Sequence, residues 1–181
     1  MTDAMPRLLA SLCLGVLLAG PARAEFVGRF SVSAVRIPDL AEPDWGRRET
    51  ETGVTYLCAN LERCAFPTGI EVKGVLRSDP LPEAFRSGAL SPARMVAQGR
   101  ANAVARGSTF RLAEPYRIGA LEGVHMEAEI KMGGPVHILT RWVGRGDRLL
   151  EVKVTSADLD AARRLSDLAM GSLVPQVFPG P

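Results

Sequence analysis

Two histidines and two glutamates are the residues of this sequence whose types and spacing best suit chemistry. His125 and His137 are the two histidines of the chain. Glu127 and Glu129 follow His125 at two-residue spacing, so the three side chains would lie on one face of an extended strand. Imidazole and carboxylate groups are ligands for divalent metal ions. His125, Glu127, Glu129 and His137 therefore form a candidate metal site.

The predicted register of a hairpin brings these side chains together. A five-residue loop that pairs Ile130 with Val136 would place Glu129 opposite His137 and put Arg141 on the same face. Because Arg141 offsets the negative charge, a second interpretation stays open. The face would then be a solvent-exposed strand surface with cross-strand charge pairs, each worth a fraction of a kcal/mol.

Signatures of most enzyme classes are absent from the sequence. There is no G-x-S-x-G, G-x-G-x-x-G, P-loop, H-E-x-x-H or C-x-x-C motif. We therefore expect a non-enzymatic binding or envelope assembly protein that requires no cofactor. The alternative is a small metal-assisted or hydrolytic enzyme that uses His125, Glu127, Glu129 and His137.

The N-terminus has the three parts of a secretory signal peptide. Arg7 supplies a positive charge, residues 8–19 form a short apolar run, and Ala22-Arg23-Ala24 fits a cleavage site. The run is shorter than the ~20 residues that a membrane-spanning helix needs. Residues 1–24 therefore predict export to the periplasm or beyond the cell, with no stable membrane anchor after cleavage. Residues 25–181 are expected to form a single globular domain with a loose, proline-rich C-terminal tail.

Cysteine usage agrees with export. Removal of Cys13 with the signal would leave Cys58 and Cys64, an even number suited to an oxidising compartment. We predict a disulfide between them. A redox pair usually has two intervening residues instead of five, and metal binding by two thiolates would need further ligands nearby.

The net charge and the tryptophan residues indicate what kind of partner the protein binds. The chain has 22 basic and 20 acidic residues, and this balance gives no case for nucleic acid. We expect a protein partner or a small ligand. Trp45 lies among Pro, Gly and charged residues, where it would either contact a partner or be buried under its loop.

The order of predicted elements indicates an α+β fold. Strands are expected over residues 26–37, 53–60, 69–76, 108–113, 123–131, 136–143 and 149–155. Helices are expected over residues 91–106 and, after a cap at Ser156, over residues 157–170. Several strands carry apolar residues on both faces. We therefore expect an antiparallel sheet with helices packed on it, in an α/β/α sandwich.

The C-terminal half resembles the Mog1/PsbP family of α/β/α sandwiches. The resemblance covers residues 85–173 and consists of the order helix, strand, long hairpin, strand, then a helix that begins after VKVTS-AD. It implies an exported or lumenal accessory protein that acts in binding or assembly. The segment with Cys58 and Cys64 has no place in the family pattern.

Overall fold

A computed structural model describes residues 26–40, 43–50, 53–60, 62–77, 97, 100–101 and 108–180. The predicted signal peptide over residues 1–24 lies outside the described residues. So does the predicted helix over residues 91–106, apart from Ala97, Arg100 and Ala101, which are helical.

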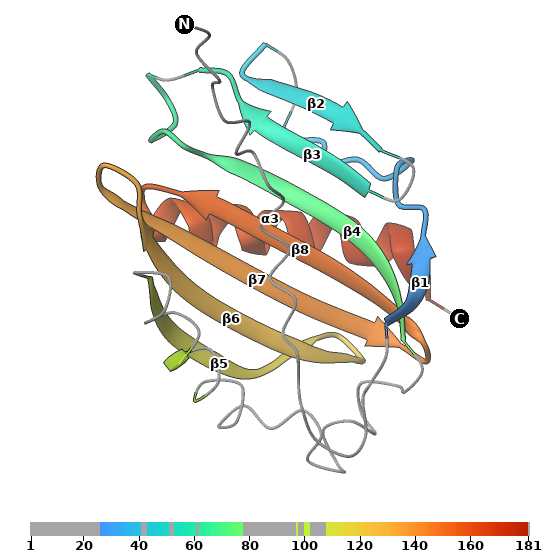
Figure 1. Ribbon diagram of the computed structural model, residues 1–181. Coiled ribbons are helices and arrows are strands. Elements are labelled where there is room, and N and C mark those ends of the chain that lie inside the picture. Colours follow the sequence, from blue (N-terminus) through green and yellow to red (C-terminus); the bar gives the residue numbers. More distant parts are fainter. Residues whose placement is uncertain are drawn as a thin grey trace, which may run out of the picture.

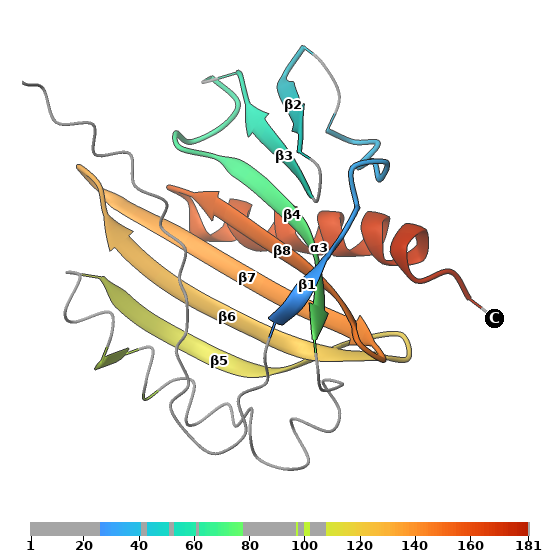
Figure 2. The same ribbon diagram turned by 45° about the vertical axis from the view of Figure 1, so that its right-hand side comes forward.

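In the described part of the chain, eight strands form one antiparallel sheet (Figure 1). The strands are β1 (Phe26–Phe30), β2 (Trp45–Glu49), β3 (Gly53–Cys58), β4 (Gly69–Arg77), β5 (Thr109–Ile118), β6 (Leu121–Lys131), β7 (Pro135–Arg145) and β8 (Arg148–Ser156). Their order across the sheet is β2-β3-β4-β8-β7-β6-β5, and β1 pairs with the far end of β4 (Figure 2). Strand β8 is thus the middle strand of this order and pairs with β4 on one side and β7 on the other.

Strand bounds depart from the predicted ones mainly near the N-terminus. The predicted strand over residues 26–37 ends at Phe30, and residues 31–40 form turns. β2 was not predicted, because Pro43 and Gly46 indicate a turn. Gly46 pairs with Leu57 on β3, so this glycine lies inside a paired strand and not in a turn.

One long helix follows the sheet. Helix α3 (Leu159–Val177) begins at the N-cap Asp158, whose side chain accepts a hydrogen bond from the Ala161 amide at 3.0 Å. This bond lowers the pKa of Asp158. The helix was predicted to stop near residue 170, but it continues through Pro175 and is followed by the buried Phe178. The residues expected to form a loose tail therefore begin as helix.

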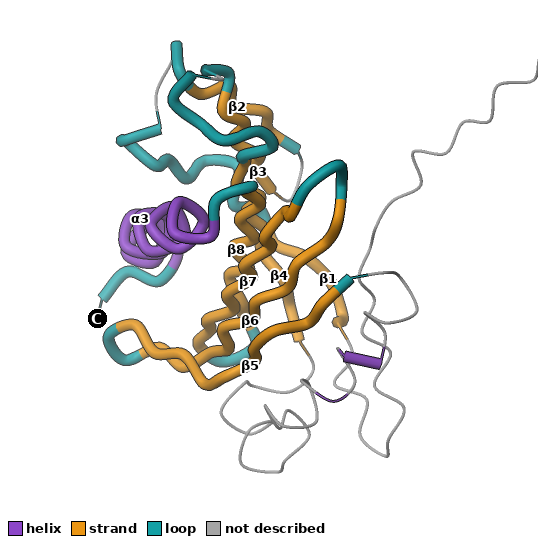
Figure 3. Tube along the Cα trace, turned by 90° about the vertical axis from the view of Figure 1, so that its left-hand side faces the viewer, coloured by secondary structure: helices purple, strands orange, loops and turns teal. Residues whose placement is uncertain are grey.

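Helix α3 covers one face of the sheet and contacts β8 and β7 (Figure 3). Its buried residues are Ala162, Ser166, Ala169, Met170 and Leu173. The apolar residues among them form one core with apolar side chains of the facing strands, among them Leu139, Val152 and Val154. The fold is α+β and dominated by its sheet. Within the described residues one helix packs on that sheet, and none of the helices there is long and apolar enough to cross a membrane.

The structure contains a disulfide between Cys58 and Cys64, with a Cα–Cα distance of 6.3 Å. It closes the loop between β3 and β4, which the sequence predicted as a bridged loop. Asn60 also orders the loop, because its side chain donates to Asp44 at 2.8 Å and accepts from the Glu62 amide at 3.1 Å.

Candidate functional site

The hairpin formed by β6 and β7 has the predicted register. Ile130 pairs with Val136 and Glu129 with His137, and His125 lies opposite Arg141. The four candidate ligands and Arg141 therefore share one face of the sheet.

That face is not solvent-exposed, which corrects one of the two interpretations of the sequence. It is the face that α3 covers, and His125, Glu127, His137 and Arg141 are all buried, with 5 to 9% of their surface exposed. The cross-strand charges lie in the interior instead, where each needs a partner. The opposite face carries Trp142, whose Nε1 donates to Glu151 at 2.8 Å.

The carboxylate of Glu127 accepts hydrogen bonds from two side chains, Arg163 and His125. The guanidinium of Arg163, on α3, binds its two oxygens in a bidentate pair with both N–O distances at 3.0 Å. His125 Nε2 lies 3.0 Å from the same carboxylate. Burial would raise the pKa of Glu127, but the hydrogen bonds from Arg163 and His125 outweigh it, and the net pKa is lowered. Glu127 is therefore an ionised acceptor.

Arg141 determines the tautomer of His125. Its Nε donates to His125 Nδ1 at 3.1 Å, so this ring nitrogen carries no proton and Nε2 is the donor to Glu127. Arg141 also pairs with Asp167 of α3 and lies over the Tyr116 ring, with Cζ 4.6 Å from the centroid. Burial raises the pKa of Tyr116, against the opposing effect of Arg141. Both nitrogens of His125 are thus occupied by protein groups.

The other two candidate ligands, Glu129 and His137, have fewer hydrogen-bond partners. Glu129 pairs with Arg111 of β5, and its Oε2 lies 3.7 Å from His137 Nδ1. That nitrogen is buried and has no hydrogen-bond partner in the described chain. The four predicted ligands therefore separate into two pairs, His125–Glu127 and Glu129–His137. Within the described residues, no group of three or more His, Cys, Asp or Glu side chains is arranged to hold a metal ion.

The first pair belongs to a network that fastens the helix to the sheet. Arg163 and Asp167 come from α3, and they bind Glu127 and Arg141 of β6 and β7. The sequence did not single out either helical residue, because charged residues at helical spacing are typical of an exposed face. The alternation of polar and apolar residues along the hairpin did predict which side chains share a face. The residues that bind those side chains, however, come from the helix that follows β8.

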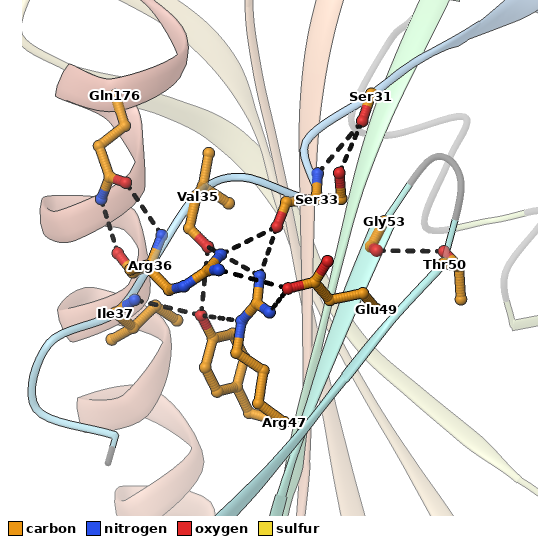
Figure 4. Close-up of polar contacts among 11 residues, drawn as sticks. Ser31, Ser33, Val35, Arg36, Ile37, Arg47, Glu49, Thr50, Gly53 and Gln176 are labelled. Carbon is orange, nitrogen blue, oxygen red and sulfur yellow. Dashed lines mark hydrogen bonds and ion pairs between the residues drawn. The ribbon is translucent and has the colours of Figure 1, made fainter.

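A second polar cluster, centred on Arg47 of β2, was also missed by the sequence (Figure 4). Arg47 donates to the main-chain oxygens of Ser33 and Val35, to Tyr56 Oη at 3.3 Å, and to Glu49. The cluster therefore ties the segment of residues 31–37 to the sheet.

Gln176 of α3 fastens the same segment from the other side. Its side-chain oxygen accepts from the Arg36 amide at 2.9 Å, and its nitrogen donates to the Arg36 carbonyl at 2.6 Å (Figure 4). Residues 31–37 are thus held between sheet and helix by paired hydrogen bonds.

Comparison with known proteins gives distant structural matches. No protein-family model and no curated protein matches the chain. Among solved structures, it is similar to LpqN, involved in cell envelope biogenesis of Mycobacterium tuberculosis, at 14% identity and a TM-score of 0.41, over 77% of this chain and 78% of that one.

Two further matches have lower TM-scores. PA94, a protein of unknown function from Pseudomonas aeruginosa, matches at 17% identity and a TM-score of 0.37, over 77% of this chain and 99% of that chain. A Bacteroides thetaiotaomicron protein matches at 10% identity and a TM-score of 0.37, over 62% of this chain and 35% of that chain. Each of these three TM-scores is below 0.5, so these matches assign no function to the chain.

Proposed function

We propose that this chain is an exported protein that binds a partner protein or a small ligand in the cell envelope, without catalysing a reaction. The disulfide between Cys58 and Cys64 carries the proposal. Disulfides form and persist in oxidising compartments and are rare in the cytosol. The predicted signal over residues 1–24 would deliver the chain to such a compartment.

The pairing of the candidate catalytic groups supports a non-enzymatic function. A general base or nucleophile must reach a substrate. His125 has Arg141 on one nitrogen and Glu127 on the other, and the oxygens of Glu127 bind Arg163. These groups satisfy each other beneath α3 and stabilise the packing of the helix.

The Mog1/PsbP-type sandwich is the fold we propose for the whole domain, and the direction of the strands supports it. β4 and β5 run the same way, since three strands and four antiparallel pairings separate them. Such a connection crosses one face of a sheet and is right-handed in nearly all proteins. Helix α3 covers one face of the sheet (Figure 1), and a three-layer sandwich needs a second helical layer on the other face. The predicted helix over residues 91–106 would then supply the third layer.

Export and disulfide formation can be tested together. The full chain would be expressed in a bacterium, fractionated and analysed by mass spectrometry with thiol labelling. We expect a mature chain in the envelope fraction that begins near Glu25, with Cys58 and Cys64 unlabelled until reduction. Leu17→Arg in the apolar run should retain the precursor in the cytosol. A full-length wild-type chain in the cytosol with labelled thiols would refute the proposal.

The binding function needs its own experiment. Cross-linking of the chain in intact cells, followed by purification and mass spectrometry, should identify a reproducible partner or bound small molecule. Turnover of an ester, peptide or phosphoester substrate that His125→Ala abolishes would contradict the non-enzymatic proposal.

Metal binding stays a second proposal, and one observation favours part of it. His137 Nδ1 is buried without a hydrogen-bond partner among the described residues, and it lies 3.7 Å from Glu129. Calorimetry with zinc should then show binding that His137→Ala removes and His125→Ala leaves in place. Equal zinc affinity for the wild type and both variants would exclude a site at either histidine.

A further inference from the structure

A shallow hollow of about 400 Å³ lies between the segment of residues 36–40 and strands β2 and β3. Its lining combines apolar side chains with two guanidinium groups: Ile37, Leu40, Trp45 and Tyr56, with Arg36 and Arg47. The volume is within the range of small-molecule sites, about 300–1,000 Å³. None of the groups considered above for catalysis or metal binding lies in it.

The apolar part of the hollow is held in place by hydrogen bonds. Tyr56 is almost completely buried, and its hydroxyl accepts from the Ile37 amide at 3.2 Å. Trp45 is buried too, at 8% exposed, in a strand paired along its length with β3. Its burial agrees with one of the two interpretations of the sequence. A preformed site lowers the entropy that binding costs.

The charged side of the hollow has more positive than negative groups. Arg36 Nη2 lies 3.3 Å from Glu49 Oε1, and Arg47 Nη1 pairs with the same oxygen. Two guanidiniums therefore share one carboxylate. Asp39, the carboxylate in the adjoining turn, is exposed and forms no ion pair with either arginine in the described chain.

The two arginines differ in availability. Arg47 is largely enclosed and donates to main-chain oxygens and to Tyr56 (Figure 4). The Arg36 side chain is 55% exposed, and its Nη1 is the group that binds the carbonyls of Ser33 and Val35. Arg36 is thus the more solvent-accessible of the two guanidinium groups, and a planar guanidinium matches the geometry of a carboxylate.

We infer that this hollow binds a small amphipathic carboxylate, with its apolar part against Trp45 and Leu40 and its carboxylate on Arg36. The inference rests on the proposed binding function and specifies the ligand class. Two sources share this chemistry: a free fatty acid, and the C-terminal residue of a partner peptide with an apolar side chain. The experiment distinguishes them.

The test compares two ligands with the same chain length, one with a carboxylate head group and one with a neutral hydroxyl. Octanoate and octanol would be titrated into the purified protein, with calorimetry and tryptophan fluorescence as readouts. We expect octanoate to bind about fivefold tighter than octanol, the factor that one partly exposed ion pair supplies. The variant Arg36→Gln should remove that preference. The matched control is Arg117→Gln, which breaks another exposed Arg–Glu pair, with Glu122 on the hairpin of β5 and β6, and should leave the preference intact.

A second arm identifies the source of the carboxylate. A short peptide that ends in leucine would be tested with a free and with an amidated C-terminus. Tighter binding of the free-acid peptide than of octanoate supports a partner's C-terminus, and the reverse supports a fatty acid. Equal binding of octanoate and octanol, absence of binding by every probe, or an equal effect of the two arginine variants would overturn the inference. An exported chain that binds none of these probes would refute the ligand class and leave the envelope function standing.

Discussion

The substitution Glu127→Gln probes the network that joins α3 to the sheet. The carboxylate accepts two hydrogen bonds from Arg163 and one from His125, each at 3.0 Å. Glutamine keeps one acceptor oxygen, removes the negative charge and turns an amide group toward a guanidinium. A buried donor or acceptor that loses its partner costs roughly 1–3 kcal/mol. Because Arg163 is half-exposed and can regain water, we expect a loss of about 2 kcal/mol at neutral pH.

The effect should depend on pH in a defined direction. The folded state lowers the pKa of Glu127, through the hydrogen bonds that outweigh its burial. Its stabilising contribution is therefore present in full above the unfolded pKa of about 4.3, and it is lost as the pH falls through the folded pKa. The difference in stability between wild type and Glu127→Gln should shrink accordingly below about pH 4.

Urea unfolding of both proteins across this pH range measures the effect. Glu122→Gln is the matched control, since its pair with Arg117 is exposed and should contribute less than about 0.5 kcal/mol. The double variant with Arg163→Gln should reveal coupling between the two sites. A cost below about 0.5 kcal/mol for Glu127→Gln at pH 7, or a cost that is the same at pH 7 and pH 3, would refute our account of the network.

Three other perturbations have expected outcomes. Replacement of Cys58 and Cys64 by serine should lower the free energy of unfolding by about 2 kcal/mol, the value for a short closed loop, and reduction of the wild type should match it in urea melts. Tyr56→Phe should cost roughly 1–2 kcal/mol in the same assay, because buried main-chain and guanidinium donors lose an acceptor; a neutral result would mean that water replaces the hydroxyl. Gly123→Ala should abolish or severely reduce folded protein by circular dichroism, because a Cβ there would lie 1.7 Å from the Trp142 carbonyl oxygen; a normal melt would contradict the close approach of β6 and β7.

The register of the hairpin was predictable from the sequence because it depends on local features. Side chains alternate with a period of two, and the loop after Ile130 leaves one pairing that matches both apolar rows. The positions of Glu129 and His137 opposite each other follow from that pairing. The disulfide loop is local in the same sense, since its cysteines are six residues apart.

The environment of the hairpin was not predictable in the same way. Whether His125 faces water or the interior depends on where α3 packs, and the helix comes after two further strands. Arg163 and Asp167 look like residues of a solvent-exposed helix face, and they become partners of buried groups only through the tertiary fold. The Arg47 cluster has the same origin, because Arg47 and Gln176 are brought to one segment from opposite ends of the chain.

The pairing of β4 with β8 has a consequence for the order in which the sheet folds. Gly69 of β4 pairs with Thr155 of β8 and Leu76 with Arg148, so the partners are about 70 to 90 residues apart. Among the strands that the structure describes, β1, β2 and β3 join the sheet only through β4. A nascent chain thus holds two incomplete halves whose open edges cannot meet until residue 156 is available, and contacts of such high sequence separation form slowly. A chain built in this way closes its sheet only after its last strand, β8, has been synthesised.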